Sequence, residues 1–238
     1  MPHAGDGGAS AAPGPAPPAW SPTLREPVYA VGIRVLDGWV RARFRLRVHG
    51  LGHVPPSGPA LIAPNHVSYE DPLAVFVAAH RAGRRVRAVA VGEAFERPVV
   101  GWVLRQGRQI PLHPGRGDET LAAAHAALAA GELVLLYPEG TIPGPGQRVT
   151  ARRGLGWLAI VARAPIIPVT SWGLARHGSG RRVRGVRSPV GLVIGPPLVP
   201  HPSRGYGDVS PRALAEHALA RVRRQLPAAR RLAAARGR

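Results

Sequence analysis

The sequence predicts a single α/β domain, in which a mixed β-sheet is flanked by helices and preceded by an amphipathic N-terminal helix. Between about residues 50 and 200, apolar runs of strand length alternate with segments of helical periodicity. The length of 238 residues suits one domain with extensions, and the hydrophobic fraction of 45% is typical of a globular core. The expected parts are a tail at 1–22, a helix at 23–48, the domain at 49–205, and a basic C-terminal helix and tail at 206–238.

The two N-terminal parts differ in what they can bury. Residues 1–22 are rich in Ala, Gly and Pro and have almost no branched apolar side chain, so we expect them to be disordered. In the helix that follows, an apolar side lies opposite an arginine side. The apolar side carries Val28, Val31, Val35, Trp39, Ala42 and Leu46, and the opposite side carries Arg34, Arg41 and Arg45. Such a helix can lie in a lipid headgroup layer or pack on its own domain, and the sequence leaves both possibilities open.

Turn and capping residues delimit the elements of the domain. We expect strands at 60–63, 86–91, 110–112, 133–137, 166–169 and 191–194, and helices at 72–80, 98–105, 119–130, 152–163 and 211–225. Pro72 suits a first helical turn. Asp118 and Ser210 are expected N-caps, and Gly131 is expected to end a helix. Pro111 places its short strand at an edge of the sheet, because proline lacks the N–H that a central strand donates.

Two residue types are absent from the chain. Without Cys there is no thiolate nucleophile, thiolate metal site or disulfide. Without Lys, since all 32 basic residues are Arg, there is no Schiff-base chemistry and no lysine of a P-loop. The function classes that need either residue are therefore excluded.

The net charge of +19 is unevenly distributed. Counting Arg against Asp and Glu gives +3 for residues 1–50, +4 for 51–175 and +12 for 176–238. This basic C-terminal third favours a polyanionic partner, either an anionic bilayer or a nucleic acid, although GC-rich coding also raises the Arg content. No run of 18 apolar residues and no secretory signal is present, so we expect no membrane-spanning helix and a cytoplasmic location.

A histidine and an aspartate lie five positions apart after the first predicted strand, in the segment Asn65-His66-Val67-Ser68-Tyr69-Glu70-Asp71-Pro72. On one continuous helix that offset turns two side chains about 140° apart, so they can meet only if His66 lies in a loop and Asp71 begins the helix. Asp71 would then fix the imidazole tautomer and stabilise the imidazolium that forms when His66 takes a proton from a hydroxyl. We therefore interpret the pair as a general base and its partner.

His66 and Glu70 have the spacing of one helical face, which a metal site could use. No third or fourth ligand is clustered with them in the sequence. We therefore expect neither a metal nor a cofactor.

A second segment, Tyr137-Pro138-Glu139-Gly140-Thr141, follows a predicted buried strand, at the end where α/β domains place ligands. Gly140 permits close backbone approach, Thr141 offers a hydroxyl, and Glu139 can bind substrate hydroxyls or hold an arginine. Bidentate contacts to an anion could come from the nearby arginines Arg148, Arg152 and Arg153.

Together these segments resemble the glycerolipid acyltransferases typified by 1-acylglycerol-3-phosphate (lysophosphatidic acid) acyltransferase. Residues 65–72 resemble the family's Asn-His-x4-Asp block, and 137–141 resemble its Phe-Pro-Glu-Gly-Thr block with Tyr in place of Phe. Residues 165–169, Pro-Ile-Ile-Pro-Val, resemble a fourth block, and Arg153-Gly154 resembles the basic residue and glycine before it. The resemblance covers about residues 45–200.

The resemblance implies that an acyl chain moves from acyl-CoA or acyl carrier protein to the hydroxyl of a lysophospholipid, in phospholipid biosynthesis. His66 would be the general base and Asp71 its partner. The implied substrate-binding residues are Asn65, Arg108, Arg116, Glu139, Gly140, Thr141 and Arg153. The family usually has an arginine where this chain has His113-Pro114, so Arg108 or Arg116 would have to substitute for it. This departure leaves the acceptor headgroup open.

The expected partners are the thioester donor, the lysophospholipid acceptor and an anionic membrane surface, with the protein held peripherally on the cytoplasmic face of the cell membrane. Two alternatives remain open at this point. An Arg-rich nucleic-acid-binding protein would use the basic C-terminal third, but the aromatic content of 5% is low for stacking on bases, so we expect no nucleic acid partner. A catalytically silent lipid-binding relative would keep the fold without the activity.

Overall fold

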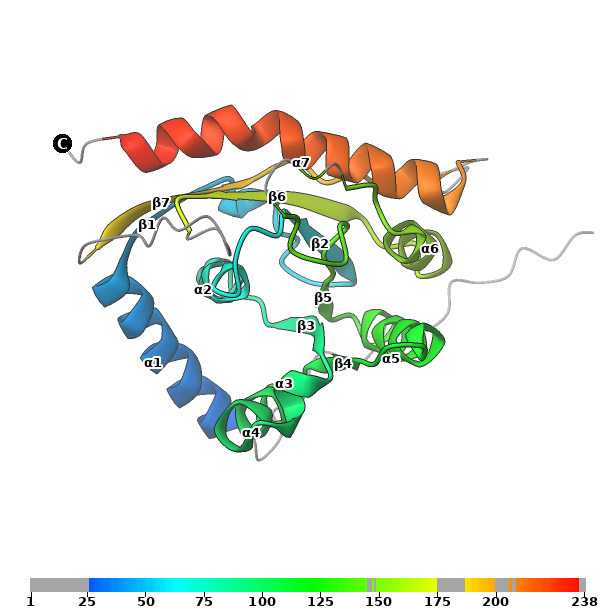
Figure 1. The fold of residues 1–238 in the computed structure, drawn as a ribbon, viewed down its shortest axis with the longest axis horizontal. Helices are drawn as coiled ribbons and strands as arrows, with labels where there is room; N and C mark the ends of the chain where they lie inside the picture. Colours follow the sequence, from blue (N-terminus) through cyan, green and yellow to red (C-terminus); the bar gives the residue numbers. More distant parts are fainter. Residues whose placement is uncertain are drawn as a thin grey trace, which may run out of the picture.

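The computed structural model describes residues 26–144, 147, 149–174, 187–199, 206 and 209–235. In this part of the chain one seven-stranded sheet has the order β1-β7-β6-β2-β5-β3-β4 (Figure 1). The strands are β1 Phe44–His49, β2 Ala60–Pro64, β3 Val86–Val91, β4 Ile110–Leu112, β5 Leu133–Leu135, β6 Ile166–Trp172 and β7 Ser188–Ile194. The helices are α1 Glu26–Arg43, the short 3-10 helix η1 Leu51–His53, α2 Asp71–Arg81, α3 Glu93–Glu96, α4 Pro98–Gln106, α5 Gly117–Ala129, α6 Arg153–Val161 and α7 Pro211–Ala234.

The sheet is mixed, which confirms the predicted fold class. Five strands, β2 to β6, run parallel to one another. At one edge β7 pairs antiparallel with β6, and β1 runs parallel to β7. The carboxyl ends of β2 and β5 therefore lie at the same edge of the sheet as the beginning of β1, which we call the catalytic edge.

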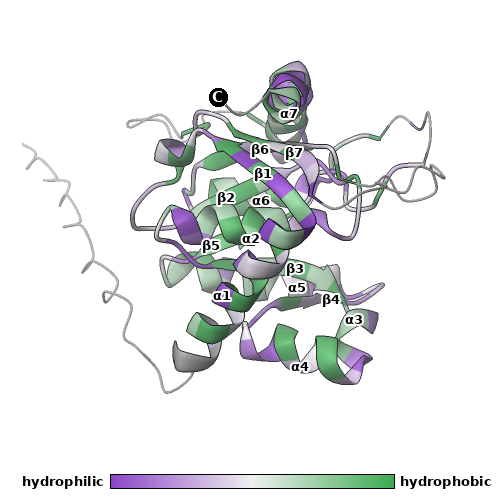
Figure 2. Ribbon diagram, turned by 90° about the vertical axis from the view of Figure 1, so that its left-hand side faces the viewer, coloured by the Kyte–Doolittle hydropathy of each residue, from purple (hydrophilic) through white to green (hydrophobic). Residues whose placement is uncertain are grey.

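Helices cover both faces of the sheet (Figure 1). On one face α5, α6 and α7 share a hydrophobic cluster with Leu61 of β2, and on the other α2 shares a cluster with Ile62. Neighbouring residues serve opposite faces because side chains alternate along a strand. β2 is buried along its whole length and lies in the middle of the molecule (Figure 2), as expected for a central parallel strand.

Only one side of α1 is packed against the domain. Val40 joins Phe44, Val77 and Val190 in a third hydrophobic cluster, and Ile33 is also buried. The predicted apolar side at Val31, Val35 and Trp39 remains exposed. The structure therefore confirms packing on its own domain for one side of α1, and the other side faces outward. None of the helices in the described ranges is long and apolar enough to cross a bilayer.

The predicted helix 23–48 is wrong at its C-terminal end, because residues from Phe44 onward form β1. The segment Phe-Arg-Leu-Arg-Val-His alternates apolar and polar residues, and this period of two fits a strand. Pairing with β7 makes β1 part of the sheet, so a domain boundary at 49 is too late. Residues 1–22 lie outside the described residues.

Most other predicted elements are confirmed, with shifted ends. Ser210 caps α7 by accepting from the Ala213 N–H at 3.2 Å, but the helix continues to Ala234. Asp118 is not an N-cap, because α5 begins before it and the capping position is Arg116. Gly131 has the left-handed φ of 77° that suits a helix stop. The strand predicted at 133–137 ends at Leu135, which leaves Tyr137 in the loop at the catalytic edge.

Candidate active site

His66 lies in the loop between β2 and α2, and its neighbour Asn65 ties this loop to β6. The Asn65 amide donates to the Ser171 carbonyl at 3.1 Å and accepts from the Ser171 N–H at 2.7 Å. Asn65 is buried, and both ends of its amide are used in this pairing. Asn65 therefore positions the loop that carries His66, and both ends of its amide are already used.

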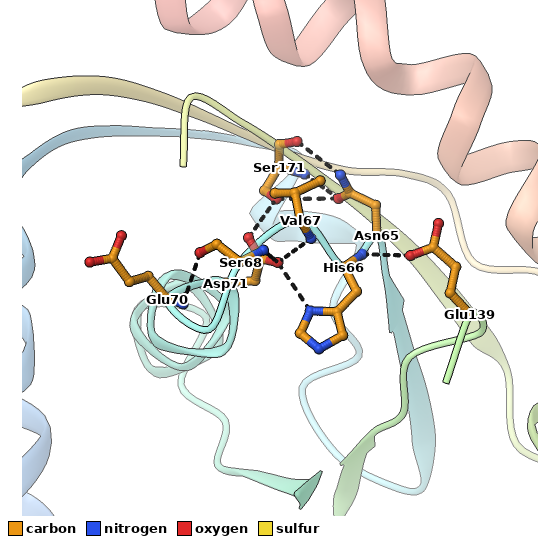
Figure 3. Close-up of polar contacts among 8 residues, drawn as sticks. All are labelled: Asn65, His66, Val67, Ser68, Glu70, Asp71, Glu139 and Ser171. Atoms are coloured by element: carbon orange, nitrogen blue, oxygen red, sulfur yellow. Dashed lines mark hydrogen bonds and ion pairs between the residues drawn. The ribbon is translucent and has the colours of Figure 1, made fainter. Parts of the chain in front are cut away.

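Asp71 begins α2 and faces back toward His66 (Figure 3). Its Oδ2 lies 3.2 Å from His66 Nδ1. Because an ionised carboxylate only accepts hydrogen bonds, this contact places the proton of the neutral ring on Nδ1. The other ring nitrogen, Nε2, points away from Asp71 (Figure 3), and within the described ranges it makes no hydrogen bond, so it can accept a proton. His66 therefore lies in a loop and Asp71 at the first position of α2, which is the arrangement that lets the two side chains meet.

Asp71 is fully buried, and three further donors hold its carboxylate. The backbone N–H groups of Val67 and Ser68 donate to Oδ2 at 2.6 and 2.7 Å, and the Ser171 hydroxyl lies 3.3 Å from Oδ1. A buried carboxylate without partners would be strongly destabilising, and these donors offset the cost of burying Asp71 beside the imidazole. They also fix the direction in which the carboxylate presents its oxygen to His66.

Glu139 holds the histidine from the opposite side. Its Oε2 accepts the His66 backbone N–H at 2.9 Å, although the two residues are 73 positions apart in the chain. Burial raises the pKa of the Glu139 carboxyl, while the His66 N–H and the charge of Arg223 lower it in part. Glu139 therefore links the second motif to the first and supports the backbone of the base.

The Tyr137 ring stacks on the imidazole. The two ring centroids are 3.8 Å apart and the planes are inclined by 17°. Burial, with Asp71 and Glu139 close by, raises the pKa of the Tyr137 hydroxyl well above its usual value, so this group stays neutral. The stacking restricts rotation of the His66 side chain and thereby keeps Nδ1 directed at Asp71.

Gly140 follows Glu139 with a left-handed φ of 67°, and it is exposed. A Cβ at this position would lie 3.0 Å from Cγ and 3.3 Å from Nε of Arg152, so the arginine side chain crosses directly over the glycine backbone. The Arg152 backbone N–H donates to the Pro138 carbonyl at 2.7 Å, and this hydrogen bond fixes the position of the Arg152 backbone beside Gly140. Arg152 is exposed, and within the described ranges its guanidinium makes no hydrogen bond or ion pair.

The remaining predicted substrate-binding residues have different positions. Thr141 and Arg153 are exposed beside Gly140 and at the start of α6. Arg116 lies after β4, at the catalytic edge, and pairs with Glu119 at 2.7 Å. These three remain predicted contacts of the substrate.

Arg108 lies away from the position that the prediction requires. It precedes β4 and lies 3.6 Å from Glu132, which precedes β5. Because β4 and β5 run parallel to β2, their beginnings lie at the edge opposite His66. Arg108 therefore cannot substitute for the missing arginine of the family's second block.

The metal interpretation of His66 and Glu70 gains nothing from the structure. No group of three or more His, Cys, Asp or Glu side chains able to hold a metal occurs within the ranges that the structure describes. The Glu70 N–H instead donates to the Ser68 hydroxyl at 2.9 Å, as part of the turn into α2.

Two functional contacts were missed from the sequence. Ser171 lies inside an ordinary buried strand, and its link to Asn65 spans 106 positions, so no local pattern marks it. Arg152 is named by the sequence analysis only as one of three nearby arginines, and the predicted substrate-binding residues include its neighbour Arg153 instead. The positive φ of Gly140, which lets the Arg152 side chain approach, is a property of the folded turn.

The fold and the His66–Asp71 pair together define an acyltransferase domain. The chain belongs to the Acyltransferase family, whose sequence profile matches residues 45–172. This match begins within β1 and ends with β6, so it includes both motifs.

Relatives of known sequence and structure agree with this family. An uncharacterized protein of Mycobacterium tuberculosis is 32% identical over 147 residues, which are 56% of this chain and 39% of the relative. The 1-acyl-sn-glycerol-3-phosphate acyltransferase LPAT1, chloroplastic, of Arabidopsis thaliana is 23% identical over 137 residues, covering 56% of this chain and 37% of the relative. The chain thus spans about two fifths of the length of the curated relatives it matches.

A crystal structure shares the fold. The 1-acyl-sn-glycerophosphate (LPA) acyltransferase PlsC from Thermotoga maritima superposes with a TM-score of 0.64. The match covers 90% of this chain and 82% of PlsC, at 22% sequence identity.

Proposed function

We propose that the protein transfers a fatty acyl chain from a thioester, acyl-CoA or acyl carrier protein, to the hydroxyl of a lysophospholipid such as 1-acylglycerol-3-phosphate, in phospholipid biosynthesis. The observation that carries this proposal is the His66 ring, with Nδ1 held by Asp71 and Nε2 free (Figure 3). Membership of the Acyltransferase family and the activities for which PlsC and LPAT1 are named support the choice of substrates.

The proposed reaction needs no covalent enzyme intermediate. His66 Nε2 takes the proton of the acceptor hydroxyl as its oxygen attacks the thioester carbonyl, and Asp71 stabilises the resulting imidazolium. The tetrahedral intermediate then collapses with cleavage of the carbon–sulfur bond. The imidazolium returns the proton to the leaving thiolate, which gives a free thiol and the acylated lipid.

Arg152 is the cation that we propose for an anionic acceptor headgroup, because it crosses Gly140 without a described partner of its own. A charge-assisted hydrogen bond contributes about 1.5–3 kcal/mol, so Arg152→Ala should raise the KM for lysophosphatidic acid roughly 10- to 100-fold. Arg153→Ala, one position along, tests the residue that the sequence predicts, and it should change KM little if Arg152 rather than Arg153 holds the headgroup. Initial rates at varied acceptor concentration measure both, and a larger effect at Arg153 would reverse the assignment.

We place the protein peripherally at an anionic membrane surface, on the cytoplasmic face of the cell membrane. The net charge of +19 supports this, since each arginine near an anionic surface contributes about 1 kcal/mol. A lipid acceptor is also most concentrated there.

The decisive experiment follows free thiol release from acyl-CoA with a panel of lysolipids. Wild type should release thiol only with an acceptor, and His66→Ala should lower the rate by about 10²–10⁴-fold with an unchanged circular dichroism spectrum. Unchanged turnover in His66→Ala would overturn the mechanism. No turnover by wild type with any acyl-CoA or acyl carrier protein donor would favour a silent lipid-binding relative.

A further inference from the structure

Helix α7 lies outside residues 45–172, which the family profile covers, yet it contacts the catalytic edge of the sheet at three places. The residues that make these contacts are Glu216, Arg223 and Arg230, each seven positions from the next. Seven residues are nearly two helical turns, so the three side chains lie along one side of α7. In Figure 1 this helix extends from α6 to β7. One side of α7 therefore faces the loops of the active site.

Two of these side chains hold the backbone that precedes Arg152. Ala151 is buried, and its N–H donates to Oε1 of Glu216 at 2.8 Å. Two residues earlier in the chain, the Val149 carbonyl accepts from Nη2 of Arg223 at 2.5 Å. A buried N–H needs an acceptor, and a charged partner makes a stronger hydrogen bond than a neutral one. α7 therefore fixes the segment 149–151 from outside the two motifs.

The position of the Arg152 side chain depends on this segment. Its own N–H bonds to the Pro138 carbonyl, so the backbone of 149–152 has two hydrogen bonds to α7 and one to the loop that carries Glu139. The guanidinium crosses Gly140 only while the backbone at Arg152 keeps this place. Arg223 also lies close enough to Glu139 for its charge to lower the pKa of that carboxyl, so α7 reaches the second motif itself.

α7 is a firm support because it packs closely on its neighbours. A Cβ on Gly156 of α6 would overlap the carbonyl oxygen of Pro211, the first residue of α7. A Cβ on Gly191 of β7 would overlap the carbonyl oxygen of Ala229, near the other end of the helix. The side turned toward the sheet is buried between these two contacts, at Leu214, Ala215, Ala218, Leu219 and Val222. The helix therefore offers Glu216 and Arg223 a defined position from which to act.

We propose that Glu216 and Arg223 are positioning residues, which hold the segment 149–152 so that the Arg152 guanidinium stays over Gly140 and binds an anionic headgroup. The proposal rests on the proposed function in its choice of Arg152 as the headgroup cation. It adds that acceptor recognition depends on a helix beyond the family profile. No hydrogen bond or ion pair joins either residue to His66 or Asp71 in the described part of the chain, so their loss should affect acceptor binding rather than chemistry.

The kinetic test follows thiol release from acyl-CoA by the full chain at varied lysophosphatidic acid concentration. Glu216→Ala removes the acceptor of the Ala151 N–H, so KM should rise roughly 3- to 10-fold while kcat stays within about twofold of wild type. Glu216→Gln keeps an oxygen that can accept this N–H, and its KM should stay close to that of wild type. A fall in kcat as large as the rise in KM, or equal losses in both variants, would overturn the proposal.

A double-mutant cycle shows whether Glu216 acts through Arg152. If it does, Glu216→Ala should raise KM no further once Arg152→Ala is present. Effects on KM that multiply in the double variant would mean that Glu216 acts independently of Arg152, and the proposal would be wrong.

Arg223→Ala and Arg224→Ala form a matched pair, since each removes one exposed arginine from α7. Arg224 makes no hydrogen bond or ion pair within the described ranges. Arg223→Ala should raise KM for the acceptor, whereas Arg224→Ala should leave KM and kcat unchanged. Equal effects would show that the overall charge of α7 matters rather than the bond to Val149, which would overturn the role of Arg223.

Hydrogen exchange of the backbone amides at 149–153 tests the positioning role without turnover. The Ala151 amide should exchange faster in Glu216→Ala than in wild type, and at the wild-type rate in Glu216→Gln. Equal exchange in all three forms would overturn the proposal. If wild type released no thiol with any acceptor while Glu216→Ala still exchanged faster, the proposed function would fail and the support of the segment by α7 would stand.

Discussion

Residue 66 illustrates how one hydrogen bond decides whether an imidazole can act as a base. Asp71 can only accept, so it keeps the proton on Nδ1 and leaves Nε2 free. In Asp71→Asn the amide oxygen would take the place of Oδ2, because only an oxygen there can accept the Val67 and Ser68 N–H groups together with Nδ1–H. The tautomer is then kept, but a neutral amide no longer stabilises the imidazolium that forms when Nε2 takes a proton.

We therefore expect Asp71→Asn to lower kcat by about 10²–10⁴-fold while the melting temperature changes little. Ser171→Ala is the control, because its hydroxyl lies 3.3 Å from Asp71 Oδ1 and 3.3 Å from Asn65 Oδ1, so its removal leaves the charge and the Oδ2 contacts of Asp71 in place. The control should keep most of the activity. Steady-state kinetics alongside thermal melts measure both forms, and equal losses in the two would mean that the hydrogen bonds of the carboxylate matter rather than its charge.

The raised pKa of Glu139 makes the stability of the folded protein depend on pH. Because burial raises the pKa of the folded carboxyl above the unfolded value of about 4.5, protonation favours the folded state. The stabilising contribution is thus fully present below the unfolded pKa and is lost as pH rises through the folded pKa. Glu139→Gln keeps an oxygen to accept the His66 N–H but carries no charge to bury.

Glu139→Gln should consequently be more stable than wild type at neutral pH, and this advantage should shrink toward acidic pH as wild type becomes protonated. Urea denaturation at about pH 4 and pH 7 gives the two free energies of unfolding. An advantage that grows as the pH falls would show that the charged form is the favoured one and that the direction of the pKa shift is the opposite.

At the scale of elements, the contact of α7 with β7 depends on a glycine. A Cβ at Gly191 would overlap the Ala229 carbonyl oxygen and lie 2.8 Å from the Ala233 backbone nitrogen. Backbone atoms cannot turn aside as a side chain would, so the helix would have to move away from the strand. The Arg47 side chain, which donates to the Ala233 carbonyl at 3.2 Å, would lose its partner at the same time.

We expect Gly191→Ala to lower the free energy of unfolding by about 1–3 kcal/mol. Gly38→Ala in α1 is the matched control, since a Cβ there meets nothing within 4 Å and alanine favours a helix by about 0.8–1 kcal/mol over glycine. Urea denaturation of both variants should move in opposite directions. An unchanged free energy of unfolding in Gly191→Ala would show that α7 and β7 can move apart without loss of stability.

Elements marked by a local sequence pattern, such as an apolar run or a capping residue, can be predicted from the sequence. Elements that form only by pairing with a segment far away in the chain cannot. β2 is a continuous apolar run, and Ser210 before Pro211 marks the start of α7. The sequence predicts helix for β1 because its apolar residues also continue the helical stripe of α1, and only pairing with β7 selects the strand. Among the site residues, His66 and Asp71 lie within one motif, whereas the contact of Asn65 with Ser171 exists only after β2 and β6 pair.

For the whole molecule, charge acts on folding and on the proposed membrane binding in opposite directions. A formal charge of +19 on a chain of 238 residues destabilises the compact state by self-repulsion. The same charge attracts an anionic bilayer. Salt screens both effects, since the Debye length falls from about 30 Å at 0.01 M to about 8 Å at 0.15 M.

Raising sodium chloride from about 0.01 to 0.15 M should therefore raise the melting temperature while it weakens binding to anionic vesicles. Calorimetry without lipid and vesicle sedimentation, on the same protein stock, give the two responses. A neutral osmolyte of equal osmolality is the control and should leave vesicle binding unchanged. Ion pairs such as Asp37 with Arg41 and Arg81 oppose the first response, because salt also screens attraction. A melting temperature that falls with salt would show that these pairs outweigh the repulsion among the remaining arginines.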